Sequence, residues 1–239
     1  MNIDFSNQVV LVAGGTGGLG RAVTLAFLAN GAHVAVTWRH ENEFHALKSS
    51  AAEHVAHLSG FNVDVTDTDQ AADLVAQILS RENRLDVLVN TVGGYAGGTP
   101  LWELRPEVLE QMLNLNLRAT YALAKAAVPP MIARKSGAIV NIASKAAWDH
   151  AAGASAYTST KAAAVALIDS LAADLMGTGV RVNSVLPSII DTEANRRAMP
   201  DADFSKWPRP DDIANVVLFL ASDSARVIHG ASIPVFGNE

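Results

Sequence analysis

Short runs of β-branched and other apolar residues alternate along this chain with longer segments of helical periodicity, and this alternation limits the folds open to it. The apolar runs are VVLVA from Val9, HVAV from His33, LDVLVN from Leu85, AIVNIA from Ala138 and VRVNSV from Val180. The helical segments begin near Leu19, Glu41, Asp69, Pro106, Tyr157 and Asp211. Several runs are apolar on both faces, which is typical of parallel strands covered by helices on each side. We therefore predict an α/β fold, a doubly wound parallel sheet of the Rossmann type with helices on both faces.

The first apolar run leads directly into a glycine cluster, GGTGGLG from Gly14 to Gly20, and then into the helical run RAVTLAFLANG. Glycines let a backbone approach a ligand closely, while a helix start offers free N–H groups and a positive dipole end to a pyrophosphate. The cluster could be only a tight turn, but its place between a strand and a helix favours a dinucleotide site. Thr16, within the cluster, could donate its hydroxyl to the loop backbone or to a phosphate.

The 239 residues contain no internal repeat, low-complexity tract or linker, so we expect one dinucleotide-binding domain over residues 1–239. A net charge of -6 without any basic run disfavours a nucleic-acid or anionic-membrane binder. Because the sequence has no cysteine, disulfides and cysteine-based zinc sites are excluded, and we expect no metal. There is no secretory signal pattern and no apolar run of about 18 to 20 residues, which favours a cytoplasmic protein.

The second apolar run ends in VTWRHENE, where the adenosine ribose of a dinucleotide would lie. An acidic residue there would bind the 2′-hydroxyl, whereas an arginine would bind a 2′-phosphate. Trp38 and Arg39 occupy the position and no Asp is available, so NADP(H) is favoured and NAD(H) stays possible. Arg39 could equally be a solvated surface charge. Glu41 and Glu43 are expected only to stabilise a helix start.

Polar residues also follow two later runs. Asp64 ends the run FNVD, and Thr66 or Asp67 could cap the helix that comes next. Asn90 ends the run LDVLVN and could join neighbouring strands through its side chain. Gly93, three residues further on, would let a cofactor lie close to the backbone.

The helical segment 106–134 contains two asparagines, Asn114 and Asn116, in an otherwise apolar stretch. Asparagine lowers the stability of a helix interior and needs partners when it is buried. Either a local distortion of the helix with an exposed carbonyl, or an interhelical hydrogen bond, would explain its presence. Pro129 and Pro130 are expected to kink or end this helix before the next strand.

A strand predicted at 138–143 would point Ser144 out of its carboxyl end, and a long helix at 157–176 would begin with Tyr157 and Lys161. Residues four apart lie on one face of a helix, so the ammonium would lie near the phenol. A nearby positive charge favours the phenolate and draws the phenol pKa of about 10 toward neutrality. Such a pair also arises by chance, but Ser144 and the glycine cluster are expected at the same edge of the sheet. Their convergence favours a chemical role.

Together these motifs resemble, over nearly all of the chain, the short-chain dehydrogenase/reductase family, specifically its classical members. The family's TGxxxGxG is matched from Ala13 to Gly20 with alanine for threonine, its DxT by Asp64 to Thr66, its NNAG loosely by NTVG from Asn90, its YxxxK by YTSTK from Tyr157, and its NxxxPGxxxT by NSVLPSIIDT from Asn183. Ser188 stands where this last pattern has glycine, which alters the backbone expected beside the nicotinamide.

The resemblance implies an enzyme that transfers hydride between a nicotinamide and a carbonyl or alcohol carbon. The implied catalytic residues are Asn116, Ser144, Tyr157 and Lys161. In reduction Tyr157 would protonate the oxygen and Ser144 would position it, while Lys161 would hold the nicotinamide ribose and lower the Tyr157 pKa. Asn116 would distort its helix so that a carbonyl anchors a water leading from Lys161 to solvent. The implied cofactor contacts are Gly14, Thr16, Gly18, Leu19, Gly20, Arg39, Asp64, Val65, Asn90, Gly93, Tyr157, Lys161, Pro187, Ile190 and Thr192.

The substrate is less well specified by the sequence. Residues 193–208 are expected to form a short lid, and the candidates for the pocket wall are Tyr95, Trp148, His150 and Ser188. The favoured function is NADP-dependent reduction of a ketone or 3-oxoacyl thioester. An NAD-dependent alcohol or sugar dehydrogenase is the first alternative, and a sensor that binds cofactor without turnover is the second. Alanine-rich helical faces would permit a homo-oligomer, a dimer or homotetramer, as the family resemblance implies.

Overall fold

Each apolar run identified in the sequence forms a strand of one parallel sheet in the computed structural model, which describes residues 3–238. The strands of the described chain are β1 (Val9–Ala13), β2 (His33–Trp38), β3 (Leu58–Asn62), β4 (Val87–Asn90), β5 (Gly137–Ile142), β6 (Val180–Pro187) and β7 (Ser232–Val235). They lie in the order β3-β2-β1-β4-β5-β6-β7, and every neighbouring pair is parallel. The chain thus winds outward in both directions from β1 and β4, which confirms the doubly wound α/β prediction.

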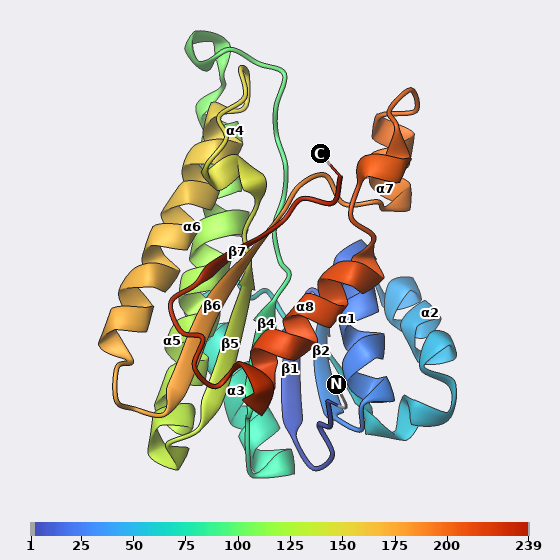
Figure 1. Cartoon of the computed structure of the whole chain (residues 1–239), viewed down its shortest axis with the longest axis vertical. Coiled ribbons are helices and arrows are strands. Elements are labelled where there is room, and N and C mark those ends of the chain that lie inside the picture. The colour runs from blue at the N-terminus through green and yellow to red at the C-terminus, as the bar shows by residue number, and fades with distance from the viewer. Residues whose placement is uncertain (1–2, 239) are drawn as a thin grey trace.

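Helices cover both faces of this sheet, as predicted (Figure 1). The α-helices of the described residues are α1 (Gly18–Ala29), α2 (Glu41–Ala51), α3 (Thr68–Glu82), α4 (Pro106–Met112), α5 (Ala119–Arg134), α6 (Ser155–Asp174), α7 (Glu193–Ala198) and α8 (Pro210–Ala221). Alternate residues of each central strand enter different cores: Val10 and Val12 pack with α1 and α8, whereas Leu11 packs with α3, α5 and α6. Within residues 3–238, no helix combines the length and apolar character needed to cross a membrane.

The segment 106–134 differs from the single helix expected there. A π-helical turn, Leu113–Arg118, separates α4 from α5. The expectation that Pro129 and Pro130 end the helix is wrong, since α5 contains both and continues to Arg134. Each proline removes one backbone donor, but Ala127 and Met131 on either side are fully buried against the sheet, and this packing keeps the backbone helical. Lys135, with φ 54°, ends the helix instead.

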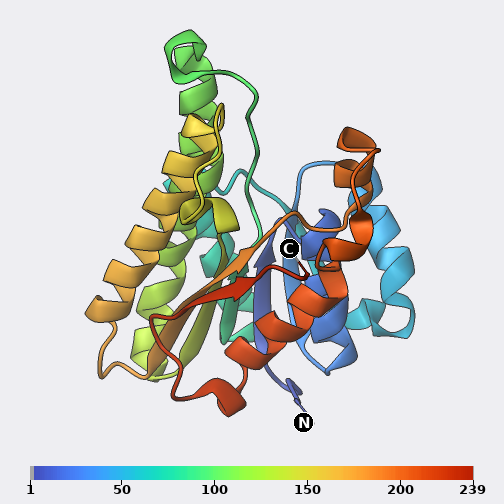
Figure 2. The same ribbon diagram turned by 45° about the horizontal axis from the view of Figure 1, so that its top comes forward.

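The carboxyl ends of the strands all point to one edge of the sheet, and long connections rise above it (Figure 2). They are the loop after β4, the segment between β5 and α6, and the segment after β6. The proposed lid, residues 193–208, is folded into α7 and a short 3-10 turn, Phe204–Lys206. Arg196 joins the two parts, because its guanidinium pairs with Asp191 and lies 4.8 Å from the Phe204 ring centroid.

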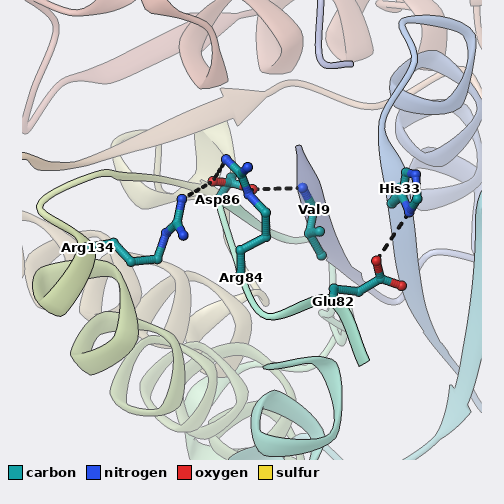
Figure 3. Close-up of polar contacts among 6 residues, drawn as sticks. All are labelled: Val9, His33, Glu82, Arg84, Asp86 and Arg134. Atoms are coloured by element: carbon teal, nitrogen blue, oxygen red, sulfur yellow. Dashed lines mark hydrogen bonds and ion pairs between the residues drawn. The ribbon is translucent and has the colours of Figure 1, made fainter. Parts of the chain in front are cut away.

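A carboxylate at the opposite edge holds the starts of two strands together (Figure 3). Asp86, just before β4, is only 7% exposed and accepts a 2.8 Å hydrogen bond from the Val9 amide of β1. The guanidinium of Arg84 donates to both of its oxygens at 2.7 and 2.8 Å, and Arg134 lies 3.5 Å away. A second pair in the same view, His33 and Glu82, is 3.2 Å long but lies much nearer the solvent.

These two contacts allow a matched test of stability. Asp86→Asn keeps the shape but removes the charge shared by two arginines and an amide, so we expect it to lower the free energy of unfolding by about 2 to 3 kcal/mol. Glu82→Gln should cost no more than about 0.5 kcal/mol, because a polar contact this near the solvent contributes little. Urea denaturation at pH 7 measures both. Equal losses from the two variants would contradict the structural role given to Asp86.

Candidate active site

The glycine cluster forms a tight loop between β1 and α1 that has no room for side chains at several positions. Gly14 has φ +76°, and its amide donates to Thr37 Oγ1 at 2.8 Å. A Cβ on Gly20 would lie 2.1 Å from the Gly14 carbonyl oxygen, and a Cβ on Gly18 would lie 2.9 Å from Thr192 Cγ2. The loop therefore folds back on the start of α1 and touches the segment that follows β6.

The start of α1 has the features of an anion site. No side chain caps the helix, whose N-cap is Gly17, so its first amides are not bound by a capping group. A backbone stripped of side chains in front of a positive dipole end fits a pyrophosphate. Thr16 donates its hydroxyl to Glu43 Oε2 at 3.0 Å, a partner that the sequence did not predict. A carboxylate thus lies beside the loop.

The end of β2 borders a groove of about 540 Å³. Exposed Arg39 lies on one side with Thr66, and Glu110 and Asn114 of the α4 region lie on the other. Asp64 accepts from the amide and the hydroxyl of Thr66, at 3.0 and 2.8 Å, and so shapes the turn after β3. The neighbouring Val65 is buried in the core, and Asp67 caps α3. β3 itself ends at Asn62, two residues earlier than predicted.

Asn90, at the end of β4, joins neighbouring elements as predicted. Its Nδ2 donates to Asn141 Oδ1 of β5 at 3.1 Å and to Thr120 Oγ1 of α5 at 3.0 Å, while its Oδ1 accepts from the Val92 amide at 3.1 Å. The side chain is 2% exposed, so these bonds are made without competition from water. They fix the direction in which the loop after β4 leaves the sheet.

Asn116 lies in the π-helical turn and is 1% exposed. Its Oδ1 accepts from the Gly94 amide at 3.0 Å, and its Nδ2 donates to the Gly94 carbonyl at 3.1 Å and to Thr160 Oγ1 of α6 at 3.1 Å. The interhelical hydrogen bond suggested by the sequence is therefore present, and the helix is also distorted, but the Asn116 carbonyl is not exposed, because it accepts a 2.9 Å hydrogen bond from the Thr120 hydroxyl. Asn114, in contrast, faces the groove beside Arg39.

Ser144, Tyr157 and Lys161 meet where β5 ends and α6 begins. Lys161 is buried and its Nζ donates to the Ile142 carbonyl of β5 at 3.1 Å. A Cβ on Gly93 would lie 3.1 Å from this Nζ and 3.0 Å from Asn116 Oδ1, so glycine at that position lets the loop after β4 lie against both. Ser144 Oγ accepts from the Ala146 amide at 3.2 Å and is hydrogen-bonded with the Tyr157 phenol.

Burial dominates the ionisation of the two titratable groups here. It lowers the pKa of Lys161 from 10.5 to about 8, because the ammonium loses hydration. It raises the pKa of Tyr157 above its ordinary value, while the hydrogen bond with Ser144 lowers it and nearby Tyr95 raises it further. The expectation that Lys161 brings the Tyr157 pKa toward neutrality is therefore wrong for the protein chain alone. The phenol stays protonated at neutral pH.

The residues named as pocket-wall candidates differ in their surroundings. Tyr95 is 71% exposed, and its ring lies edge-on to Tyr157 with 4.9 Å between centroids. Trp148 is 50% exposed and His150 is also exposed, on the segment that leads to α6. Ser188, in the segment after β6, instead donates its hydroxyl to the Phe236 carbonyl at 2.9 Å. The structure thus brings only Tyr95 against the Tyr157 phenol.

Several residues that shape this edge were not identified from the sequence. They are Thr37, Thr91, Thr120, Asn141, Thr160 and Phe236. Asn141 could have been found, because it is a lone amide inside the apolar run AIVNIA. The threonines carry no such signal, since threonine is common both in strands and near helix starts. No group of three or more His, Asp or Glu side chains within residues 3–238 is arranged to hold a metal ion.

A family model described as short chain dehydrogenase matches residues 8–203. The chain belongs to this family. Its members use NAD or NADP, and the chain is accordingly an oxidoreductase that interconverts alcohols and carbonyl compounds. The recognition of the family from its motifs is confirmed.

Known short-chain dehydrogenases resemble this one over almost their whole length. A 3-oxoacyl-(acyl-carrier-protein) reductase of Thermotoga maritima is 29% identical over an alignment 238 residues long, which covers 96% of this chain and 96% of its own. A D-threitol dehydrogenase of Mycolicibacterium smegmatis is 32% identical and covers 99% of this chain and 96% of its own. Among solved structures, ElxO with NADP bound is 30% identical, with a TM-score of 0.91 over 96% of this chain and 97% of its own.

The buried ammonium predicts a pH-dependent stability. Lys161 has a folded pKa of about 8 and an ordinary value of 10.5, so the folded state binds fewer protons than the unfolded state between these values. Stability due to this group must therefore rise with pH across that window. Relative to Lys161→Met, the wild type should gain up to about 3 kcal/mol between pH 8 and 10.5. Urea denaturation at several pH values measures the difference.

Exposed Lys125 of α5 provides the control. Lys125→Met makes the same chemical change at an exposed position, so the curve of Lys161→Met is compared with those of Lys125→Met and of the wild type. If the curve of Lys161→Met ran parallel to both, the buried ammonium would not be the group that titrates.

Proposed function

We propose that this chain uses NADPH to reduce a carbonyl compound, a small ketone or a 3-oxoacyl thioester, with Tyr157 as the proton donor. The observation that carries the proposal is the contact between the Tyr157 phenol and Ser144, beside a lysine buried under a glycine-lined loop. The Tyr157 phenol is protonated at neutral pH and therefore carries the proton that reduction requires. The similarity to a 3-oxoacyl reductase and to an NADP-bound structure supports the direction and the cofactor.

The proposed cofactor site runs along the carboxyl edge of the sheet. The pyrophosphate would be bound by the glycine loop, through Gly14, Thr16, Gly18, Leu19 and Gly20. The 2′-phosphate would be bound by Arg39, and the adenine by Asp64 and Val65. The central part of the cofactor would lie against Asn90 and Gly93, and its nicotinamide end against Pro187, Ile190 and Thr192. The approach of Thr192 to Gly18 supports this assignment, because it brings the segment assigned to the nicotinamide end against the loop assigned to the pyrophosphate. A bound nicotinamide would supply the hydride to the substrate carbon.

The proposed proton chemistry belongs to the side chains of the chain itself. Tyr157 gives its phenolic proton to the substrate oxygen, and Ser144 donates a hydrogen bond that orients the same oxygen. Lys161 holds the ribose hydroxyls and compensates the phenolate that Tyr157 becomes. Asn116 keeps Gly94 and α6 in place, which fixes the loop over Lys161. Tyr95, Trp148 and His150 form the outer wall of the substrate pocket, with residues 193–208 as its lid.

An NAD-dependent polyol or alcohol dehydrogenase is the second candidate. Glu43 favours it, because its carboxylate binds Thr16 beside the proposed phosphate site and would repel an added 2′-phosphate. The similarity to D-threitol dehydrogenase points the same way. A sensor without turnover is disfavoured, since it has no need for Ser144, Tyr157, Lys161 and Asn116 to meet.

We further propose that the chain forms a homo-oligomer, either a dimer or a tetramer, in the cytoplasm. Apolar side chains in the segment 101–112 support association, since Leu101 is 68% and Leu109 is 37% exposed. The absence of cysteine from the sequence is consistent with an intracellular setting. Light scattering of the purified protein measures the mass of the assembly, and a monomer would refute that part of the proposal.

Removing the phenolic hydroxyl tests the proton donor. With NADPH and a panel of ketones, aldehydes and acyl thioesters, Tyr157→Phe should lower kcat by about 10²- to 10⁴-fold, because general acid catalysis contributes that much. The Kd of NADPH, followed by its fluorescence, should change little. Tyr121→Phe on the surface of α5 makes the same chemical change and should keep full activity. A fully active Tyr157→Phe variant would refute the assignment of Tyr157 as the proton donor.

The cofactor choice is tested at Arg39. Arg39→Ala should raise the Kd of NADPH by roughly tenfold or more, since a charge-assisted contact to the 2′-phosphate is lost, and leave that of NADH nearly unchanged. Arg226→Ala, at the opposite edge of the sheet, changes the net charge equally and controls for long-range electrostatics. If wild type binds NADH more tightly and Arg39→Ala affects neither cofactor, the NAD-dependent alternative is favoured.

A further inference from the structure

The Ser188 side chain makes a hydrogen bond between two segments that glycine could not make. Pro187 and Val235 are paired at the carboxyl ends of β6 and β7, and the Ser188 amide extends this pairing by donating to the Val235 carbonyl at 3.2 Å. Its hydroxyl then donates to the next carbonyl, that of Phe236, at 2.9 Å. The backbone of Ser188 is not left-handed, so the position does not require glycine here. Serine therefore adds a tether without backbone strain.

The tethered Phe236 supports the turn that carries Ser144. Its ring packs in a small apolar cluster with Ala143 and Ala147, the residues on either side of that turn. The ammonium of Lys145 lies 5.3 Å from the ring centroid, on the same turn. Leu186 of β6 belongs to the cluster as well. One aromatic ring thus contacts both the Ser144 turn and the strand that leads to Ser188.

The same short segment also reaches the proposed lid. The Asn238 amide donates to the Lys206 carbonyl at 3.0 Å. Gly237 has φ +66°, and a Cβ there would lie 2.5 Å from that carbonyl oxygen. Residues 236–238 therefore run from the Ser144 turn to the base of the lid, and Ser188 holds them at Phe236, the end nearest the Ser144 turn.

We propose that Ser188 is a positioning residue, which fixes the Ser144 turn relative to the segment after β6 by holding residues 236–238 between them. This role rests on the proposed function, because Ser144 and the segment after β6 are there assigned to the substrate oxygen and the nicotinamide. Without the tether, Phe236 can shift and the Ser144 turn loses its support. A displacement of about 1 Å at a reacting group can cost up to 10²-fold in rate.

The positional effect can be measured without any substrate. Amide hydrogen exchange of Ser188→Ala should be at least about fivefold faster than wild type in peptides covering 143–148 and 233–238, because local opening becomes easier. Ser188→Thr, which keeps the hydroxyl, should exchange like the wild type. Ser222→Ala removes a similar bond, from its hydroxyl to the Phe219 carbonyl at 2.8 Å, and should leave both peptides unchanged. Unchanged exchange in Ser188→Ala would overturn the proposal.

The kinetic arm separates positioning from simple loss of stability. On a ketone that the wild type reduces, Ser188→Ala should lower kcat roughly 5- to 50-fold while the KM of NADPH stays within about twofold, and Ser188→Thr should restore kcat. Phe236→Ala should lower kcat in the same way. If exchange responds but kcat does not, the tether does not position Ser144. If the wild type reduces no carbonyl compound, the proposed function fails, while the exchange experiment still reports whether Ser188 holds the turn.

Discussion

The arrangement at the carboxyl edge depends on one buried amide. Asn116 satisfies both polar groups of the Gly94 backbone and also bonds to Thr160, so a single side chain holds the loop after β4, the π-helical turn and α6 together. The Asn116 side chain is 1% exposed, and an unmade hydrogen bond on so buried an amide is costly. Lys161 is one turn along α6 from Tyr157, and its ammonium lies against the loop that Asn116 holds. The hydrogen bonds of Asn116 therefore help to fix the positions of Tyr157, the proposed proton donor, and of Lys161 beside it.

Strand order explains why residues distant in sequence meet. Because all strands run parallel, the loops after β1, β4, β5 and β6 leave from the same edge, and the reversal of direction at β1 and β4 opens a place between them for a ligand. The opposite edge has a different character. There Asp86 and its arginines join strand starts, at the end of the strands away from the loops of the proposed active site. Residues that stabilise the sheet and residues proposed to act on a substrate are thus separated along the strand direction.

Most of the fold could be predicted from the sequence, because buried parallel strands leave continuous apolar runs and glycine clusters have few other uses. The positions of Ser144, Tyr157 and Lys161 were also predictable from their spacing. The spacing of residues in the sequence does not show how deeply a side chain is buried, and burial shifts its pKa. The sequence led us to expect a lowered pKa for Tyr157, whereas desolvation raises it. Likewise, Pro129 and Pro130 have a strong local tendency to end a helix, which the packing of Ala127 and Met131 overrides. The partner of Ser188 lies 48 residues away, just after another strand, beyond the reach of any local pattern.

The π-helical turn at Leu113–Arg118 has a consequence for how this chain can change. Bonding over five residues instead of four places one additional residue in the same stretch of helix. Deleting any one residue there would let the helix return to regular geometry, and each residue turns an α-helix by about 100°. Asn116 would then face away from Gly94. The segment can therefore tolerate changes of side chain at its exposed positions but not a change of length, so insertions and deletions, more than substitutions, should be rare here among functional descendants.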